Sequence, residues 1–206
     1  MALSTHLPQD RVAEHDRRPT IIVCNWSQED PAWDLVEDLS GVPWQPETAH
    51  TELVEPTGDI ASMSEQLAER LLNHDVRALL LIGRTRHEGP ARVQLRAEIP
   101  HENGKRISTD TPGVVRSTGP AGEIIDAVTK AHVSIVASSE HEPDAGSELL
   151  YDLLTRMEAT LETPAISLLR FPSSMSESNI AQAVKAAVTV MTQNLTPLPR
   201  FGSGRA

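Results

Sequence analysis

The sequence predicts an α/β protein: a three-layer α/β/α sandwich around a mainly parallel, twisted sheet. Short apolar runs rich in β-branched residues, such as 20–24 and 78–82, recur along the chain and are typical of buried strands. Segments with apolar residues at helical spacing, such as 60–73, lie between these runs. We find no internal repeat, and we expect one α/β domain over residues 19–194.

The individual elements follow from local signals along the chain. Strands are predicted at residues 20–24, 51–54, 78–82, 133–136 and 165–169, with a peripheral strand at 93–99. Helices are predicted from Pro31 to Gly41, over 60–73, from Gly119-Pro120 through Val128, from about Ala145, and over 178–193. Proline suits the first turn of a helix and glycine its end, whereas Asn103-Gly104 is a tight-turn signal. Residues 1–18 are expected to form a disordered arm and residues 195–206 a flexible tail.

Charge and cysteine content exclude several classes of partner. The formal net charge of -11 argues against nucleic acid or an anionic membrane surface as a partner. Cys24 is the single cysteine, so there is no internal disulfide and no cysteine-rich metal site, and we predict no cofactor. No apolar run has the length of a bilayer span, and the N-terminus lacks the apolar stretch of a signal peptide. We therefore expect a cytoplasmic protein.

One polar loop stands where α/β proteins place their chemistry. It follows the strand predicted at 133–136 and precedes the helix that begins near Ala145. The loop carries Ser138, Ser139, Glu140, His141, Glu142 and Asp144. These residue types suit an acid/base or metal cluster, although no second histidine lies at a fixed spacing. The alternative is a solvated polar loop.

Six short motifs, taken in order, resemble the pyroglutamyl peptidase I family, also called pyrrolidone carboxyl peptidases. They are Asp30-Pro31-Ala32-Trp33, Leu80-Leu81-Ile82-Gly83, Ile99-Pro100-His101-Glu102-Asn103-Gly104, Gly119-Pro120-Ala121, Asp144-Ala145-Gly146 and Ser174-Met175-Ser176. The resemblance spans roughly residues 21–191. It implies the fold of these cysteine peptidases, which remove an N-terminal pyroglutamate and assemble into dimers or tetramers.

The departures from the family pattern fall on its catalytic residues. By the motif alignment, Leu150 stands at the position of the nucleophilic cysteine and Arg170 at that of the histidine. Arg96 stands at the position of the glutamate, with Glu98 as a second possibility. A leucine cannot attack a carbonyl, and an arginine stays protonated and cannot act as a base. The resemblance therefore implies a catalytically degenerate protein without pyroglutamyl peptidase activity.

The same alignment places three arginines, Arg84, Arg96 and Arg170, around the former cleft. Together with a helix N-terminus at Gly146 and Ser147, they would suit a carboxylate or phosphate. Trp26 is the aromatic residue that could replace the aromatic walls of the family's first loop. The alternative is that each arginine pairs with a nearby carboxylate of this acidic chain.

Cys24 is a further reactive candidate, at the carboxyl end of the first predicted strand. It would be a relocated nucleophile if His87, His101 or His141 reached it. The alternative is a small buried hydrophobic residue.

These observations favour a protein that binds an acidic small molecule or peptide in the former active-site cleft. Two alternatives stay open. One is an active hydrolase of amide or peptide bonds with rearranged catalytic residues. The other is a structural subunit of a homo-oligomer, a dimer or a tetramer.

Overall fold

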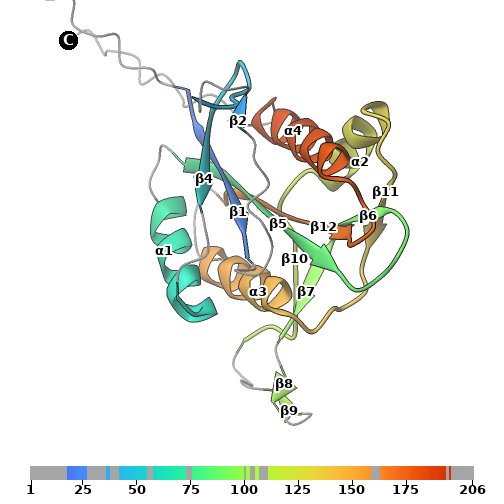
Figure 1. Ribbon diagram of the computed structural model, residues 1–206. Helices are drawn as coiled ribbons and strands as arrows, with labels where there is room; N and C mark the ends of the chain where they lie inside the picture. The colour runs from blue at the N-terminus through green and yellow to red at the C-terminus, as the bar shows by residue number, and fades with distance from the viewer. Residues whose placement is uncertain are drawn as a thin grey trace, which may run out of the picture.

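The computed structural model describes residues 18–26, 36–37, 42–54, 58–72, 76–99, 101–102, 105–106, 111–158, 163–193 and 195. A six-stranded sheet crosses the molecule in the order β11-β6-β12-β5-β1-β4 (Figure 1). Its strands are β1 (Thr20–Asn25), β4 (His50–Val54), β5 (Val76–Thr85), β6 (Ala91–Gln94), β11 (Ile135–Ser138) and β12 (Ala165–Pro172). Every neighbouring pair is parallel except β12 and β6, which run antiparallel. The predicted α/β class with a mainly parallel sheet is confirmed.

Within the described residues, four helices cover the two faces of this sheet (Figure 1). They are α1 (Ile60–Leu72), α2 (Ala121–Lys130), α3 (Ala145–Met157) and α4 (Glu177–Gln193). The helices α1 and α3 pack on one face, and α2 and α4 pack on the other. None of the described helices combines the length and the apolar character needed to cross a membrane.

Alternation along the central strands divides the apolar core into two clusters. On β1, Ile21 and Val23 face the α2/α4 cluster, whereas Ile22 and Cys24 face the α1/α3 cluster. On β12, Leu169 and Phe171 belong to the α2/α4 side. This parity places the intervening Arg170 on the α1/α3 side, at the carboxyl end of the sheet.

Three short antiparallel pairs lie outside the main sheet. They are β7 (Arg96–Glu98) with β10 (Val114–Arg116), β2 (Val36–Glu37) with β3 (Val42–Pro43), and β8 (His101–Glu102) with β9 (Lys105–Arg106). The last pair flanks the predicted Asn103-Gly104 turn, which itself lies outside the described residues.

Two predictions about secondary structure are wrong. The helix predicted from Pro31 to Gly41 is contradicted at Val36–Glu37, which form strand β2 and pair with β3. Both short strands carry a β-branched valine, which favours strand pairing over the helix that apolar spacing alone suggested. The other residues of that prediction lie outside the described part of the chain.

The strand predicted at 93–99 is not peripheral as a whole. Its first part, β6, lies inside the main sheet between β11 and β12, and only β7 leaves to pair with β10. The chain changes sheets at Leu95, whose N–H donates to the Ser138 carbonyl while its own carbonyl accepts from the Ser117 N–H. The predicted arm and tail, apart from Arg18 and Leu195, lie outside the described residues.

Candidate functional site

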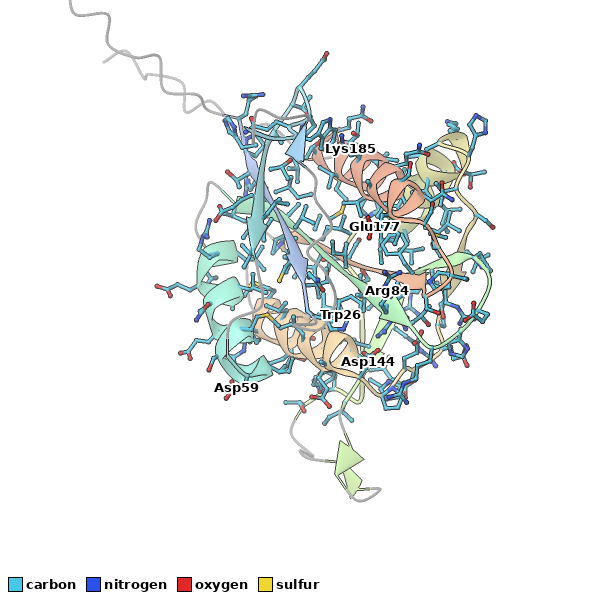
Figure 2. The ribbon with its side chains drawn as sticks, in the orientation of Figure 1. Trp26, Asp59, Arg84, Asp144, Glu177 and Lys185 are labelled. Atoms are coloured by element: carbon cyan, nitrogen blue, oxygen red, sulfur yellow. The ribbon has the colours of Figure 1, made fainter. Side chains whose placement is uncertain are left out.

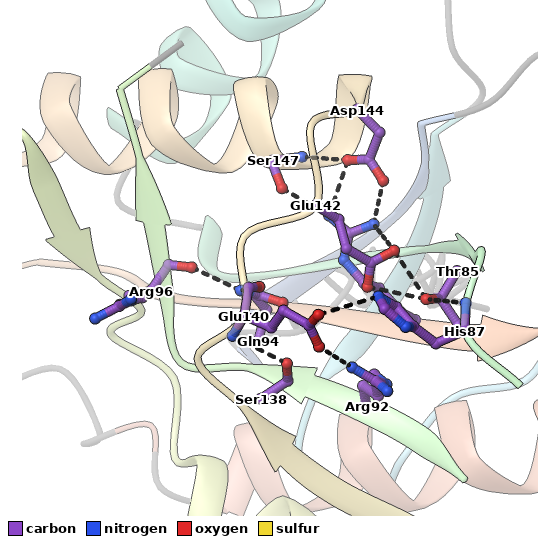
Figure 3. Close-up of polar contacts among 11 residues, drawn as sticks. Thr85, His87, Arg92, Gln94, Arg96, Ser138, Glu140, Glu142, Asp144 and Ser147 are labelled. Carbon is purple, nitrogen blue, oxygen red and sulfur yellow. Dashed lines mark hydrogen bonds and ion pairs between the residues drawn. The ribbon is translucent and has the colours of Figure 1, made fainter. Parts of the chain in front are cut away.

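The loop between β11 and α3 crosses the carboxyl ends of several strands (Figure 3). We call residues 139–144 the acidic strap, because its alternate residues Glu140, Glu142 and Asp144 are all carboxylates. Each carboxylate contacts a different element of the sheet or of the loop after β5. The strap therefore closes over the edge of the sheet at which parallel α/β proteins hold their ligands.

Asp144 and Arg170 form the central contact of the site. The Arg170 side chain is fully buried, and its Nη1 and Nη2 both donate to the Asp144 carboxylate, the second at 2.8 Å. Asp144 also caps α3, since its carboxylate accepts from the Ser147 N–H at 2.9 Å. Arg170 Nη2 reaches the Ser147 hydroxyl at 2.8 Å. One carboxylate thus serves as helix cap and as counter-ion for a buried guanidinium.

Glu142 adds a buried carboxylate beside the partly buried Asp144. Its two oxygens accept from the Thr85 hydroxyl at 2.8 and 2.9 Å, and one lies 3.6 Å from Arg170 Nη1. Thr85 in turn accepts the His87 N–H at 3.2 Å. Glu142 is 5% exposed, so the reading of this loop as merely solvated does not hold at its centre.

The outer end of the strap is held by weaker, exposed contacts. Glu140 pairs with Arg92 at 2.9 Å and with His87 at 3.6 Å, and its side chain is 57% exposed. The Gln94 amide donates to the Glu140 carbonyl at 2.8 Å. The strap is therefore anchored at both ends and in the middle by polar contacts.

Trp26 directly follows β1 and lies close to α3 (Figure 2), where it packs against two glycines. A Cβ added to Gly83 would lie 2.2 Å from an indole atom of Trp26, and one added to Gly146 would lie 2.6 Å from another. Glycine at both positions therefore leaves the space that the indole ring fills. The Arg170 guanidinium carbon lies 5.3 Å from the indole centroid, within the range of a cation–π contact. Trp26 is 7% exposed, so the indole occupies this space rather than lining an open wall.

Leu150, which the motif alignment sets at the nucleophile, and Cys24, the second candidate nucleophile, both lie among apolar side chains. Leu150 is fully buried in the α1/α3 cluster. Cys24 belongs to the same cluster, and burial raises the pKa of its thiol to about 12. At neutral pH such a thiol is protonated and a poor nucleophile.

The three candidate arginines do not converge. Arg84 is paired in register with Phe171, whose side chain lies in the α2/α4 cluster, so Arg84 points to the opposite face of the sheet from Arg170. Its Nη1 donates to the Pro172 carbonyl at 3.2 Å. Arg96 lies on β7, where it contacts Glu98 and the Ser139 carbonyl, both at 3.0 Å. Only Arg170 stands in the site together with Trp26, Gly146 and Ser147.

The histidines contribute little to the site as it stands. His141 Nδ1 is buried without a hydrogen-bond partner among the described residues, and the side chain of His101 lies outside them. Within the described ranges, no group of three His, Cys, Asp or Glu residues is arranged to hold a metal ion.

The alternative that each candidate arginine pairs with a carboxylate holds for Arg170, with Asp144, and for Arg96, with Glu98. Sequence reasoning did not identify Asp144 as the partner of Arg170, or Thr85 as that of Glu142. The signal that could have found them is the alternation Glu140-x-Glu142-x-Asp144 in a loop that precedes a helix. In an extended segment, alternate side chains point the same way, toward whatever the loop covers. The partners themselves are 26 and 57 residues distant in the sequence, so no local pattern identifies them.

Comparison with known proteins places this arrangement on a known fold. No protein-family model and no curated protein sequence matches the chain. Pyroglutamyl peptidase I from Bacillus amyloliquefaciens matches with a TM-score of 0.65 and 17% identity, over 84% of this chain and 95% of that one. A mutant pyrrolidone carboxyl peptidase from Pyrococcus furiosus matches with a TM-score of 0.68 and 16% identity, over 86% of this chain and 100% of that one. The resemblance expected from the motifs is confirmed at the level of the architecture: this chain has the pyroglutamyl peptidase I fold.

Proposed function

We propose that this chain is a non-catalytic protein with the pyroglutamyl peptidase I fold that binds an acidic small molecule or peptide at its former cleft. The observation that carries the proposal is the environment of Arg170, a fully buried cation paired with carboxylates. By the motif alignment this residue stands where a general base would be needed, and a guanidinium cannot take up a proton. A guanidinium is, however, the side chain best suited to a carboxylate.

The neighbouring positions support the absence of peptidase activity. Leu150, at the aligned nucleophile position, has no group that can attack a carbonyl and lies in the apolar cluster under α3. The covalent mechanism needs a nucleophile, a base and a group that orients the base. Aligned replacements at all of these positions favour a binding role over hydrolysis.

The test is hydrolysis of a pyroglutamyl amide that carries a fluorogenic leaving group. We expect no turnover above the uncatalysed rate. Turnover would overturn the proposal, and two variants would then locate its source. Loss of turnover on Cys24→Ser would indicate a relocated thiol nucleophile. Loss of turnover in Thr85→Val would indicate that the Thr85 hydroxyl is the source of the activity. This hydroxyl donates to Glu142 at the centre of the strap.

The proposed assembly into a homo-oligomer has a separate motivation. Leu53 on β4 and Leu72 at the end of α1 are 38% and 60% exposed. Burial of these two side chains between subunits would remove their apolar surface from water. Light scattering that gave a monomeric mass at every concentration would contradict this assembly.

A further inference from the structure

We propose that the guanidinium of Arg170 and the first turn of α3 form a binding site for a small carboxylate, which the chain occupies with its own Asp144 and which a ligand enters by displacing Asp144 while Glu142 keeps its place on Thr85. The inference deepens the proposed function and rests on it, because it names the residues that hold the acidic ligand.

The contacts of Asp144 are those that a bound carboxylate would make. Its two oxygens receive Nη1 and Nη2 of Arg170, and one of them also receives the Ser147 N–H. A planar, two-pronged guanidinium and a helix N-terminus are the two commonest devices by which proteins bind a carboxylate. The group that Asp144 places there is a carboxylate on a single methylene, so acetate is its smallest free counterpart.

The internal occupant leaves part of the site unused. Nε of Arg170 is buried and has no hydrogen-bond partner among the described residues. A buried donor without an acceptor is unfavourable, so the closed state does not satisfy this guanidinium fully.

Departure of Asp144 would not leave Arg170 isolated. Glu142 stays 3.6 Å from Nη1, and the Ser147 hydroxyl stays 2.8 Å from Nη2. The indole of Trp26 adds a cation–π contact on a further side. The cation therefore keeps partners in the open state, which lowers the free-energy cost of opening relative to that of exposing an unpaired buried charge.

The strap is held by polar contacts rather than by apolar packing. Pro143, the one apolar residue of the strap, is exposed and belongs to neither apolar cluster. Glu140, at its outer end, is 57% exposed. Segments with few buried apolar contacts are the ones that open locally in native proteins.

The experiment measures how acetate shifts the unfolding midpoint of the full chain and of Asp144→Ala, at constant ionic strength set with chloride. In the native chain acetate can bind only to the fraction of molecules in which Asp144 has left the site. The apparent affinity for acetate is therefore lower than the affinity of the vacant site. The substitution Asp144→Ala removes the competing carboxylate. It also leaves space for a group of about the size of acetate. We expect the apparent dissociation constant for acetate to fall by about tenfold or more in Asp144→Ala.

Three controls make the result specific. Acetamide has the shape of acetate without its charge and should not shift the unfolding midpoint of Asp144→Ala. Asp126→Ala removes an exposed carboxylate on α2 and should respond as the native chain does. Adding Arg170→Met to Asp144→Ala should abolish the acetate response, because the guanidinium is gone.

Equal acetate responses in the native chain and in Asp144→Ala would overturn the site, as would an equal response to acetamide. If Asp144→Ala does not fold alone, recovery of folding in acetate and not in chloride supports the site. Failure to recover, together with an acetate-insensitive Asp144→Asn variant, overturns it. These outcomes are independent of the hydrolysis assay, which alone decides whether peptidase activity is absent.

Discussion

Two helices of this protein begin with the same dipeptide, Ala-Gly, in very different surroundings. At the start of α2, Pro120 provides no side-chain cap, and a Cβ added to Gly122 would meet nothing within 4 Å. At the start of α3, Asp144 caps the helix, and a Cβ on Gly146 would press on the Trp26 indole. Only the second helix start has a buried cation beside it, Arg170. The same local sequence is therefore a plain helix start in one place and part of a candidate site in the other.

The apolar packing around Cys24, beneath α3, predicts the largest difference between the surroundings of α3 and those of α2, a difference in thiol reactivity. Burial raises the pKa of Cys24 from 9.0 to about 12, which reduces its thiolate at pH 8 by about 1,000-fold. We expect iodoacetamide to alkylate Cys24 about 1,000-fold more slowly in the native protein than in urea-unfolded protein.

Gly122→Cys in a Cys24→Ala background provides the matched control. It places an exposed thiol at the start of α2. We expect this thiol to react nearly as fast in the native as in the unfolded protein. A native Cys24 that reacts at a comparable rate would show that the region beneath α3 is open to solvent.

Removal of the capping carboxylate should be the largest effect on stability. Asp144→Ala takes away a helix cap and the bidentate partner of a buried guanidinium, which together are worth about 3 kcal/mol of unfolding free energy. Glu123→Ala removes the acidic residue in the first turn of α2 and should cost less than about 1 kcal/mol. Urea unfolding of both variants measures the two costs. Equal losses of unfolding free energy in the two variants would show that Asp144 stabilises the protein no more than an ordinary helix cap does.

The two glycines provide the next comparison. In Gly146→Ala the new methyl would lie 2.6 Å from a buried indole ring, so we expect a loss of about 1–3 kcal/mol from overpacking. In Gly122→Ala the methyl meets no atom, and the better helix propensity should raise stability by up to about 1 kcal/mol. Thermal unfolding should give shifts of opposite sign. Two stabilising substitutions would mean that Trp26 does not fill the space beside α3.

The smallest effect is expected for an exposed ion pair of similar geometry, Arg70 with Glu52, which links α1 to β4. Both side chains are about 40% exposed, and Glu52→Gln should cost less than about 1 kcal/mol. The hydrogen bond from Arg70 lowers the pKa of Glu52, so this stabilisation is present above the ordinary carboxyl pKa. It is lost as the pH falls through the lowered value, which urea midpoints measured at a series of acidic pH values should show. A loss as large as that of Asp144→Ala would remove the distinction between buried and exposed pairs.

The fold could be predicted from the sequence largely because its signals are local. Apolar runs such as 78–82 and the helix from Ile60 to Leu72 are recognisable without knowledge of their neighbours. The error at Val36–Glu37 arose where short segments suit either a helix or a hairpin and tertiary pairing decides. The site was harder to predict, because parity along β5 and β12 sends Arg84 and Arg170 to opposite faces. Motif alignment placed both arginines near the cleft, but the direction of a side chain depends on register.

The pairing of Asp144 with Arg170 is the central claim, and a double-mutant cycle tests it most directly. The cycle compares the unfolding free energies of the native chain, Asp144→Ala, Arg170→Met and the double variant. Asp144→Ala removes the bidentate partner of a buried guanidinium, and Arg170→Met removes the counter-ion of a partly buried carboxylate. The double variant removes both charges, so we expect a coupling of about 2–3 kcal/mol. Costs that add to within about 0.5 kcal/mol would contradict the pairing, and with it the anchoring of the acidic strap to β12.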